Sequence, residues 1–236
     1  MSFSVYVYVN ANVDSLNNLK NIMVSYNNSD DIPDEIVFNV TGIESEEHLS
    51  ILKDLYREKY SNVHIYATKS HSSKAKEYNK AVVLTTGDFV VFNPPNRIPS
   101  SKRMEITKHF TSLGKYGILH NCCYSVDALN DGYEIENIKT ISSDMLFARY
   151  YPFKEQYGCW RYTRTYGSEF GLKSVDMESP VVYRDILKVT KWKEPFECKL
   201  YHGNSDGMSY EFALETLYTY KKSLIIDLPL TIYGVL

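Results

Sequence analysis

The clearest candidates for chemistry in this sequence lie in the turn 93–96, which reads NPPN, and in the basic residue that follows it. The amides of Asn93 and Asn96 offer neutral carbonyl oxygens, which bind Mg²⁺ or Mn²⁺ more weakly than carboxylates because they do not offset the charge of the dication. Arg97, together with Lys74, could instead meet a phosphate group through charged hydrogen bonds. The turn therefore predicts phosphate recognition by basic side chains, with weak metal binding, if any, at Asn96.

The turn is expected at the end of a buried strand. Residues 89–92 (FVVF) are apolar without alternation, which is typical of a strand covered on both faces. Before them, apolar residues recur at steps of three or four from Ala75 to Thr85, as on one side of a helix, and Gly87 is expected to end this helix in a left-handed conformation. Two prolines cannot continue a strand, so the chain turns at its carboxyl end, where ligands bind in open α/β sheets.

The rest of the sequence predicts an α/β fold with crossover helices. Strands are expected at residues 3–9, 35–40 and 63–67, separated by helices from about 14 to 26, capped by Asp14 or Ser15, and from 44 to 60. Beyond the turn we expect a helix at 99–113, strands at 116–119 and 122–126, an extended segment at 174–183, a helix at 208–218 and a strand at 224–227. No glycine-rich phosphate loop follows any strand, which disfavours dehydrogenases and P-loop ATPases.

Composition narrows the possible partners and location. The 236 residues contain no obvious linker, which favours a single domain, and a net charge of −3 argues against a nucleic-acid partner. No apolar run approaches the roughly 20 residues of a membrane span. The four cysteines have no zinc spacing and the N-terminus does not read as a signal peptide, so a cytoplasmic location is expected. The apolar residues before Leu236 suggest that the chain is part of a longer protein.

Part of the sequence follows the pattern N-x-G-x-x-x-A-x-G-(D/E)-(Y/F) of family 2 glycosyltransferases. The residues on this pattern are Asn79, Ala81, Thr85, Gly87, Asp88 and Phe89. The chain thus resembles that family, whose GT-A fold has a mixed, mostly parallel sheet flanked by helices. In the family, the segment leads into a D-x-D turn that holds a divalent cation on the diphosphate of a nucleotide sugar. Here Pro94 and Asn96 stand in the places of the two acids.

The resemblance also implies binding residues and partners. It covers residues 3–98 well and 174–233 loosely, and it predicts a nucleotide-binding half (1–98) and an acceptor half (99–236) of one GT-A-like domain. The donor would be a nucleotide-diphosphate sugar, with Mn²⁺ or Mg²⁺ only weakly supported, and the acceptor a glycan or a protein. Asn39 matches an acidic position of the family that helps to hold the nucleobase of the donor. The residues expected to bind the nucleotide are Asn10, Asn39, Lys74, Asn79, Asn93, Asn96 and Arg97.

A general base for the acceptor hydroxyl is the other requirement of an inverting sugar transfer. Residues 207–214 lie on the family's helix start G-E-D-Y-E-F-x-L, in which the aspartate is the base, but here Met208 and Ser209 replace the acidic pair. Asp206 is the first candidate for the base, and a helix N-cap is its structural alternative. Glu211 is the second candidate, and an ordinary surface glutamate is its alternative.

Further polar and aromatic residues leave two readings open. Residues 144–172 contain Arg161, Arg164 and nine aromatic side chains, which predict either a partly buried surface segment or an acceptor-side loop that stacks on a sugar and contacts phosphate. His120 and His202 could be bases or ligands, although single histidines are more often structural.

The sequence therefore suggests two functions and disfavours a third. The first is an inverting GT-A glycosyltransferase that uses a nucleotide-diphosphate sugar. The second is a catalytically silent GT-A domain that binds a sugar nucleotide, a glycan or a protein, as the loss of both acidic motifs would suggest. The third, a nucleotidyltransferase, is disfavoured because the sequence has no G-x-G-x-R-type loop near its N-terminus.

Overall fold

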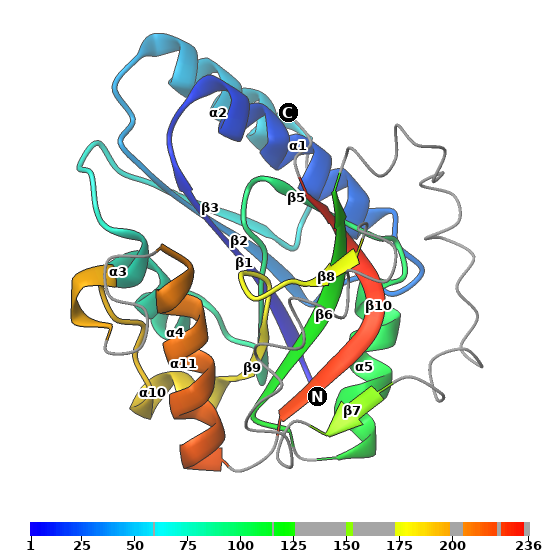
Figure 1. Ribbon diagram of the computed structural model, residues 1–236. Helices are drawn as coiled ribbons and strands as arrows, with labels where there is room; N and C mark the ends of the chain where they lie inside the picture. Colours follow the sequence, from blue (N-terminus) through cyan, green and yellow to red (C-terminus); the bar gives the residue numbers. More distant parts are fainter. Residues whose placement is uncertain are drawn as a thin grey trace.

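The structure is a computed structural model that describes residues 1–58, 60–114, 116–125, 150–152, 173–198, 205–220 and 223–233. Within these residues, ten strands form one sheet in the order β3-β2-β1-β4-β9-β6-β10-β5, with β7 beside β10 and β8 beside β6 (Figure 1). The strands are β1 (Phe3–Asn10), β2 (Glu35–Thr41), β3 (Val63–Ala67), β4 (Phe89–Phe92), β5 (Arg97–Pro99), β6 (Ile118–Ser125), β7 (Tyr150–Pro152), β8 (Lys173–Val175), β9 (Val181–Tyr183) and β10 (Ser223–Tyr233).

The long strands of the sheet share one direction. β3, β2, β1 and β4 are parallel neighbours. Because β9 is antiparallel to both β4 and β6, β6 runs the same way as β4, and β10 is parallel to β6. Four short strands, β5, β7, β8 and β9, run the opposite way. The predicted α/β fold with a mixed, mostly parallel sheet is confirmed.

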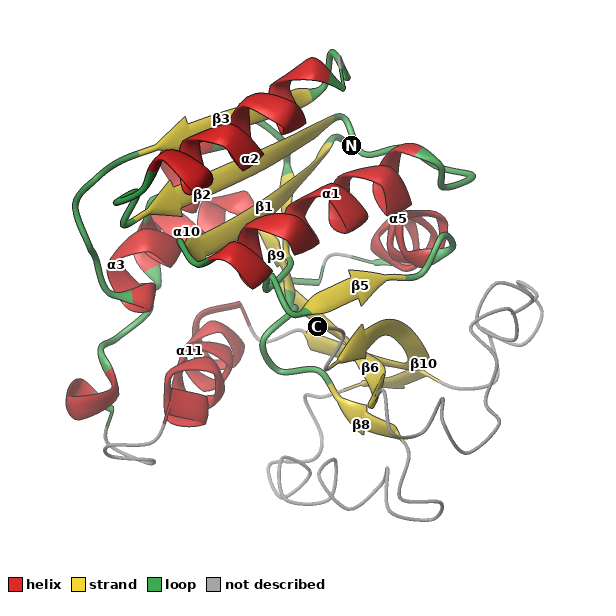
Figure 2. Ribbon diagram, turned by 90° about the horizontal axis from the view of Figure 1, so that it is seen from above, coloured by secondary structure: helices red, strands yellow, loops and turns green. Residues whose placement is uncertain are grey.

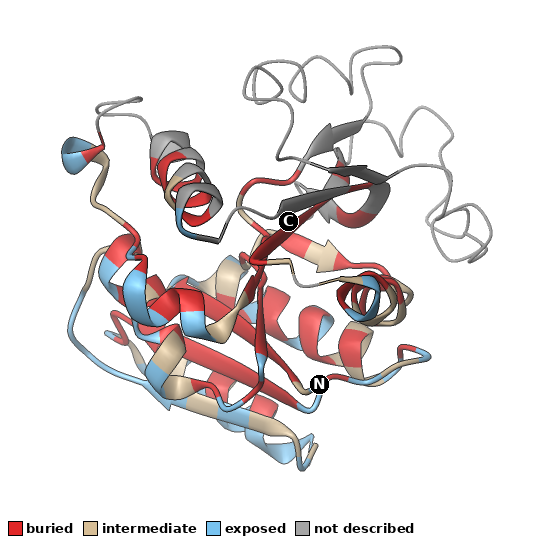
Figure 3. Ribbon diagram, turned by 90° about the horizontal axis from the view of Figure 1, so that it is seen from below, coloured by how far each residue is buried: buried red, intermediate tan, exposed pale blue. Residues whose placement is uncertain are grey.

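Helices cover both faces of this sheet. They are α1 (Val13–Asn27), α2 (Glu46–Arg57), α3 (Lys74–Asn79), α4 (Ala81–Leu84), α5 (Arg103–Leu113), α10 (Arg184–Val189), the 3₁₀ helix η3 (Pro195–Glu197) and α11 (Ser205–Tyr220). α1, α2 and α5 pack into the hydrophobic cluster of one face, and α3, α4, α10 and α11 into that of the other (Figure 2). The central strands β1, β2 and β4 are therefore buried, whereas the edge strand β3 is partly exposed (Figure 3).

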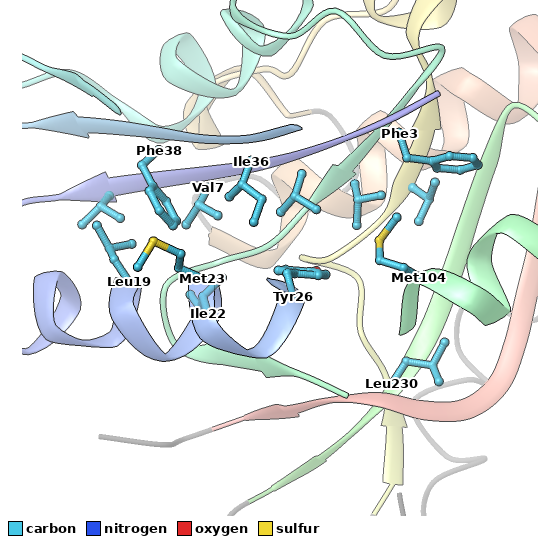
Figure 4. Close-up of a cluster of buried hydrophobic side chains, with 14 of the residues drawn as sticks. Phe3, Val7, Leu19, Ile22, Met23, Tyr26, Ile36, Phe38, Met104 and Leu230 are labelled. Carbon is cyan, nitrogen blue, oxygen red and sulfur yellow. The ribbon is translucent and has the colours of Figure 1, made fainter. Parts of the chain in front are cut away.

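The sequence of β1 explains why the sheet has two apolar faces. Its side chains point alternately to opposite sides, so Val5, Val7 and Val9 join one cluster while Tyr6 and Tyr8 join the other. Full burial of one such side chain contributes about 1.5–3 kcal/mol. Figure 4 shows the first cluster, in which α1 faces β1 and β2. Its labelled residues from these three elements are Phe3, Val7, Leu19, Ile22, Met23, Tyr26, Ile36 and Phe38.

The structure corrects several predicted boundaries in the first half of the chain. Asn12, not Asp14 or Ser15, caps α1, since its side chain accepts a hydrogen bond from the Ser15 backbone. The helix predicted from 44 to 60 is shorter and is capped by Ser45. The helix predicted before Gly87 is divided into α3 and α4. The strands at 63–67 and 89–92 are confirmed to the residue.

Boundaries in the second half change because strands pair with distant segments. The helix predicted at 99–113 begins at Arg103, since residues 97–99 form β5 against β10. The two strands expected within 116–126 are the single strand β6, and the extended segment 174–183 divides into β8, a turn and β9. The predicted strand 224–227 is part of the longer β10, which runs from Ser223 to Tyr233. Among the described residues, no helix is both long and apolar enough to cross a membrane.

Gly87 is required by a close approach between chain segments, not by the predicted left-handed conformation. Gly42 is the described glycine with a positive φ, of 74°. A Cβ atom on Gly87 would lie 2.7 Å from the Ser4 backbone nitrogen and 2.6 Å from its Oγ. The Gly87 amide also donates to Ser4 Oγ at 2.7 Å. This contact fixes the start of β4 against β1.

Replacing Gly87 with alanine is therefore expected to lower the free energy of unfolding by about 2–3 kcal/mol, because backbone atoms must move to admit the methyl group. Urea denaturation of the two proteins measures the difference. Gly114→Ala is the control: its Cβ would meet only the Tyr116 side chain, at 3.1 Å, and we expect a loss below about 1 kcal/mol. Equal losses for both variants would contradict this account of Gly87.

Candidate functional site

The topology of the sheet places a candidate ligand site at the carboxyl ends of β1 and β4. From β1 the chain passes through α1 to β2 on one side, and it returns through α3 and α4 to β4 on the other side. The strand order reverses between β1 and β4, and ligands of open α/β sheets bind outside such a reversal. The turn after β4 is attached here, since the Asn93 backbone nitrogen donates to the Tyr6 carbonyl at 3.0 Å.

Asn93 uses its whole hydrogen-bonding capacity inside the protein. Its Oδ1 accepts from the Tyr26 hydroxyl at 3.0 Å and from Arg103 Nη1 at 2.6 Å. Its Nδ2 donates to the carbonyls of Pro94 and Arg97, at 2.9 and 2.8 Å. An amide has two donor hydrogens and two acceptor lone pairs, so this side chain is saturated. Asn93 shapes the turn and has no capacity left for a ligand.

Arg103 holds the turn after β4 through hydrogen bonds to Asn93 and Phe92. It is not among the residues that the sequence predicts for the site. Its side chain is fully buried. Besides Asn93 and the Tyr26 hydroxyl, at 2.7 Å, its guanidinium donates to the carbonyls of Phe92 and Ser179, at 3.1 and 2.9 Å. One planar group thus ties β4, α1 and the segment before β9 together. The helical pattern of the sequence could have indicated that Arg103 is buried, because it shares a helix face with Ile106 and Phe110, where an apolar residue is expected.

Arg97 follows the turn and forms a buried ion pair with Asp176. Its Nε lies 3.2 Å from Asp176 Oδ2, which also accepts a hydrogen bond from Thr231 Oγ1 at 2.7 Å. Burial by itself would raise the pKa of Asp176, but the charge of Arg97 and the bond from Thr231 hold it below the ordinary aspartate value. Asp176 is therefore ionised at neutral pH and anchors Arg97.

Glu178 joins Arg97 to Lys74 at the surface of the site. Its Oε1 lies 2.5 Å from Lys74 Nζ, and its Oε2 lies 3.5 Å from Arg97 Nη2. The side chains of Lys74 and Glu178 are 34% and 23% exposed, so solvent reaches this part of the site. We call the four residues Lys74, Arg97, Asp176 and Glu178 the Lys74–Arg97 cluster. It unites the start of α3, the start of β5 and the turn between β8 and β9.

The described residues of this site do not fit a divalent cation. The Asn93 oxygen is occupied by Arg103 and Tyr26, position 94 is a proline, and the neighbouring Arg97 already carries a positive charge. Asn96 is half-buried and offers one neutral oxygen. Among the described residues there is no group of three or more histidine, cysteine, aspartate or glutamate side chains able to hold a metal.

Asn10 lies where the sequence placed it, at the carboxyl end of β1, and its amide contacts a neighbouring loop. Its Oδ1 is 3.2 Å from His71 Nδ1, and His71 Nε2 is 2.6 Å from Glu44 Oε1. The loop is close because position 42 is glycine: a Cβ there would lie 2.6 Å from the His71 ring. The Asn10 end of the site is thus formed by the loops after β1, β2 and β3.

Asn39 points into the protein instead of toward the sheet edge. It lies within β2 and is buried, and its Nδ2 donates to the Tyr6 hydroxyl and to Glu77 Oε2, both at 2.7 Å. Burial, more than any neighbour, raises the pKa of Tyr6. Glu77 also pairs with Lys80 at 2.7 Å. This network attaches α3, and with it Lys74, to the sheet.

Asn79 has a structural contact as well. Its side-chain amide exchanges two hydrogen bonds of 2.9 Å with the backbone of Trp192. The Trp192 ring stacks on Phe212 of α11, with ring centres 4.0 Å apart, and packs edge-on against Tyr78. Asn79 therefore holds α11 beside α3, at the side of the site where the sequence placed the general base.

α11 carries the two candidate bases. The helix begins at Ser205, so Asp206 is in its first turn and not in a loop before residue 208. Ser209, at the position of the family's aspartate, is buried, and its Oγ has no hydrogen-bond partner among the described residues. Glu211 is buried rather than exposed, and its Oε1 accepts from Lys193 Nζ at 2.9 Å.

The predicted nucleotide-binding residues have different roles. Lys74 and Arg97 meet in one cluster, and Asn10 lies at the neighbouring strand end. Asn93 holds the turn after β4, and Asn39 and Asn79 support α3 and α11. His120 is buried behind the cluster, 3.4 Å from the Asp176 carbonyl, and burial lowers its pKa to about 4. Predictions for three other residues lie outside the described part of the chain: Arg161, Arg164 and His202.

The fold is that of the GT-A glycosyltransferases. TarS of S. aureus, solved with UDP-GlcNAc, superimposes with a TM-score of 0.65 at 16% sequence identity, over 100% of this chain and 59% of TarS residues 1–349. The mannosyltransferase PcManGT of Pyrobaculum calidifontis, with GDP-Man and Mn²⁺, gives 0.62 at 11% identity, over 99% of this chain and 57% of that one. Glucosyl-3-phosphoglycerate synthase of Mycobacterium tuberculosis, solved with Mn²⁺ and UDP, superimposes with a TM-score of 0.59 at 11% sequence identity. The match covers 100% of this chain and 72% of the synthase.

At these identities the comparisons establish the fold alone. No protein-family model and no curated protein sequence matches the chain. The chain also spans only about six tenths of the length of the TarS and PcManGT structures. Its substrate and reaction must therefore be inferred from its own residues.

Proposed function

We propose that this chain is a glycosyltransferase domain that moves a sugar from a nucleotide-diphosphate sugar to a hydroxyl group of a glycan or protein, with inversion at the anomeric carbon. The Lys74–Arg97 cluster carries the proposal: in a GT-A fold, two basic side chains meet beside the reversal of the strand order. The similar structures were solved with UDP-GlcNAc, GDP-Man or UDP, which supports a nucleotide ligand of this class.

The role of the basic residues follows from the charge of the leaving group. As the bond between the anomeric carbon and the phosphate oxygen breaks, negative charge develops on the departing nucleoside diphosphate. Positive groups already fixed at that place stabilise the transition state, because they need no reorganisation. Asp176 and Thr231 hold Arg97 in position, and Lys74 begins a helix that Glu77 attaches to the sheet. The donor would lie along the strand ends, with its diphosphate at these two residues.

A base completes the reaction by accepting the proton of the acceptor hydroxyl as its oxygen bonds to the anomeric carbon. Asp206 and Glu211 are five positions apart, which separates the two positions by about 140° around α11. Position 206 is one turn before Ser209 and shares its side of the helix. Because Glu211 is engaged by Lys193, we assign the base to Asp206.

A catalytically silent domain is the second candidate, and two observations favour it. Ser209 replaces the family's aspartate and is buried. In addition, Glu178 already pairs with both cations of the cluster. A silent domain of this kind would bind a sugar nucleotide, a glycan or a protein partner without turnover.

Binding and turnover measured side by side separate these functions. The protein is titrated with UDP-, GDP- and dTDP-sugars in a calorimeter, and release of the nucleoside diphosphate is followed with and without candidate acceptors. The glycosyltransferase proposal expects one donor to bind and to be consumed. Binding without release, unchanged in Asp206→Asn, would support the silent domain, and binding of no nucleotide would contradict both.

A further inference from the structure

We propose that Glu178 acts as an internal competitor of the donor diphosphate, holding Lys74 and Arg97 until the nucleotide displaces it. This inference rests on the proposed nucleotide site and names the residue that sets its affinity. The carboxylate of Glu178 places one oxygen 2.5 Å from Lys74 Nζ and the other 3.5 Å from Arg97 Nη2. Two anionic oxygens bridging two cations from different elements are what a phosphate group would supply in the same place.

The two acidic residues of the cluster differ in burial, and this difference assigns their roles. Asp176 is fully buried and bonded to Arg97 and Thr231, so removing it would leave a buried charge without a partner. Glu178 and Lys74 are both partly exposed, and exposed ion pairs contribute little to stability. Lys74 can therefore exchange Glu178 for another anion at small cost, whereas Asp176 remains with Arg97.

The net charge of the Lys74–Arg97 cluster also supports a role for Glu178 as a competitor of the diphosphate. Lys74 and Arg97 are balanced by Asp176 and Glu178, so the four residues have no net charge and attract a diphosphate weakly. The backbone nitrogen of Glu178 donates to Asp176 Oδ1 at 3.2 Å, which fixes the turn from which its side chain reaches both cations. When Glu178 is displaced or neutralised, the cluster gains one positive charge without a change in its framework.

Calorimetric titration with inorganic pyrophosphate, in EDTA, tests the inference independently of the nucleobase that the donor carries. Glu178→Gln keeps the size and hydrogen-bonding capacity of the side chain but removes its charge, and we expect pyrophosphate to bind about tenfold more tightly than to the wild type. Glu178→Ala is expected to change the affinity in the same direction. In a Lys74→Gln background the gain should be smaller, because one of the two cations is absent.

Glu105→Gln is the matched control, since Glu105 also pairs with a lysine, Lys102, but lies on α5. Its affinity for pyrophosphate should stay within about twofold of the wild type, because Glu105 is not part of the Lys74–Arg97 cluster and exposed charges are screened by salt. Equal or weaker binding by Glu178→Gln, in a folded protein, would overturn the inference. If the wild type turns over a sugar nucleotide in that case, the proposed glycosyltransferase function still holds. If Glu178→Gln gains affinity for pyrophosphate while no sugar nucleotide is turned over, the role of Glu178 is supported and the glycosyltransferase proposal is contradicted.

Discussion

Replacing Asp206 with asparagine is expected to reduce the rate of sugar transfer by about 10²–10⁴-fold, the range that general bases usually contribute. Asparagine has nearly the same size but cannot accept the proton of the acceptor hydroxyl. The affinity for the donor should change by less than about twofold, because the diphosphate is assigned to Lys74 and Arg97. Initial rates with the donor found in the panel, together with calorimetric titration, measure both quantities.

Glu211→Gln is the control for this experiment, because it removes the other candidate carboxylate from the same helix. Its Oε1 is engaged by Lys193, so we expect transfer to fall by less than about tenfold. A transfer rate that is lost in Glu211→Gln but kept in Asp206→Asn would assign the base to Glu211. If both variants kept the wild-type rate, neither residue would be the base.

Replacing Arg103 with methionine should lower the free energy of unfolding by about 3–4 kcal/mol. The guanidinium donates to four buried acceptors, and each acceptor left without a donor costs about 1–3 kcal/mol, partly offset because the buried charge is also removed. For a chain of this length the melting temperature should fall by about 10 °C. Arg103→Lys should also destabilise the protein, because an ammonium group cannot reproduce the planar fork.

Arg57→Met provides the reference for Arg103. The Arg57 side chain is 79% exposed and pairs with Asp54 one turn earlier on α2, so its replacement should cost less than about 0.5 kcal/mol. Thermal and urea unfolding of the three variants measure these differences. A loss for Arg103→Met no larger than that for Arg57→Met would show that the turn after β4 does not depend on the buried arginine.

Local pattern was sufficient to predict β3 and β4 but not the contacts of the site. The predicted bounds 63–67 and 89–92 agree to the residue because both segments are short, rich in β-branched or aromatic residues and bounded by polar or turn residues. β5 was missed because its three residues are strand only through pairing with β10, which comes much later in the chain. The same is true of Arg97, whose partners Asp176 and Glu178 come from a distant turn.

The sequence revealed that acidic residues are absent from the turn 93–96 but not what the amides do instead. Asn93 was predicted as a nucleotide-binding residue, and only the position of Arg103 beneath it shows that its amide is used internally. The predictions for Asn39 and Asn79 rest likewise on their place in a pattern, whereas their partners come from other elements. Polar side chains can be counted from a sequence, whereas the direction in which they point depends on packing.

The central claim is that Lys74 and Arg97 hold the donor diphosphate without a divalent cation. It is tested most directly by titrating the wild type and Lys74→Gln in EDTA with the sugar nucleotide that the panel selects, with Lys188→Gln as the control for loss of an exposed lysine. We predict that the wild type binds equally well in EDTA and in Mn²⁺, and that Lys74→Gln loses at least about tenfold in affinity, as expected for one charged hydrogen bond. Binding that requires Mn²⁺, or full affinity in Lys74→Gln, would contradict the claim.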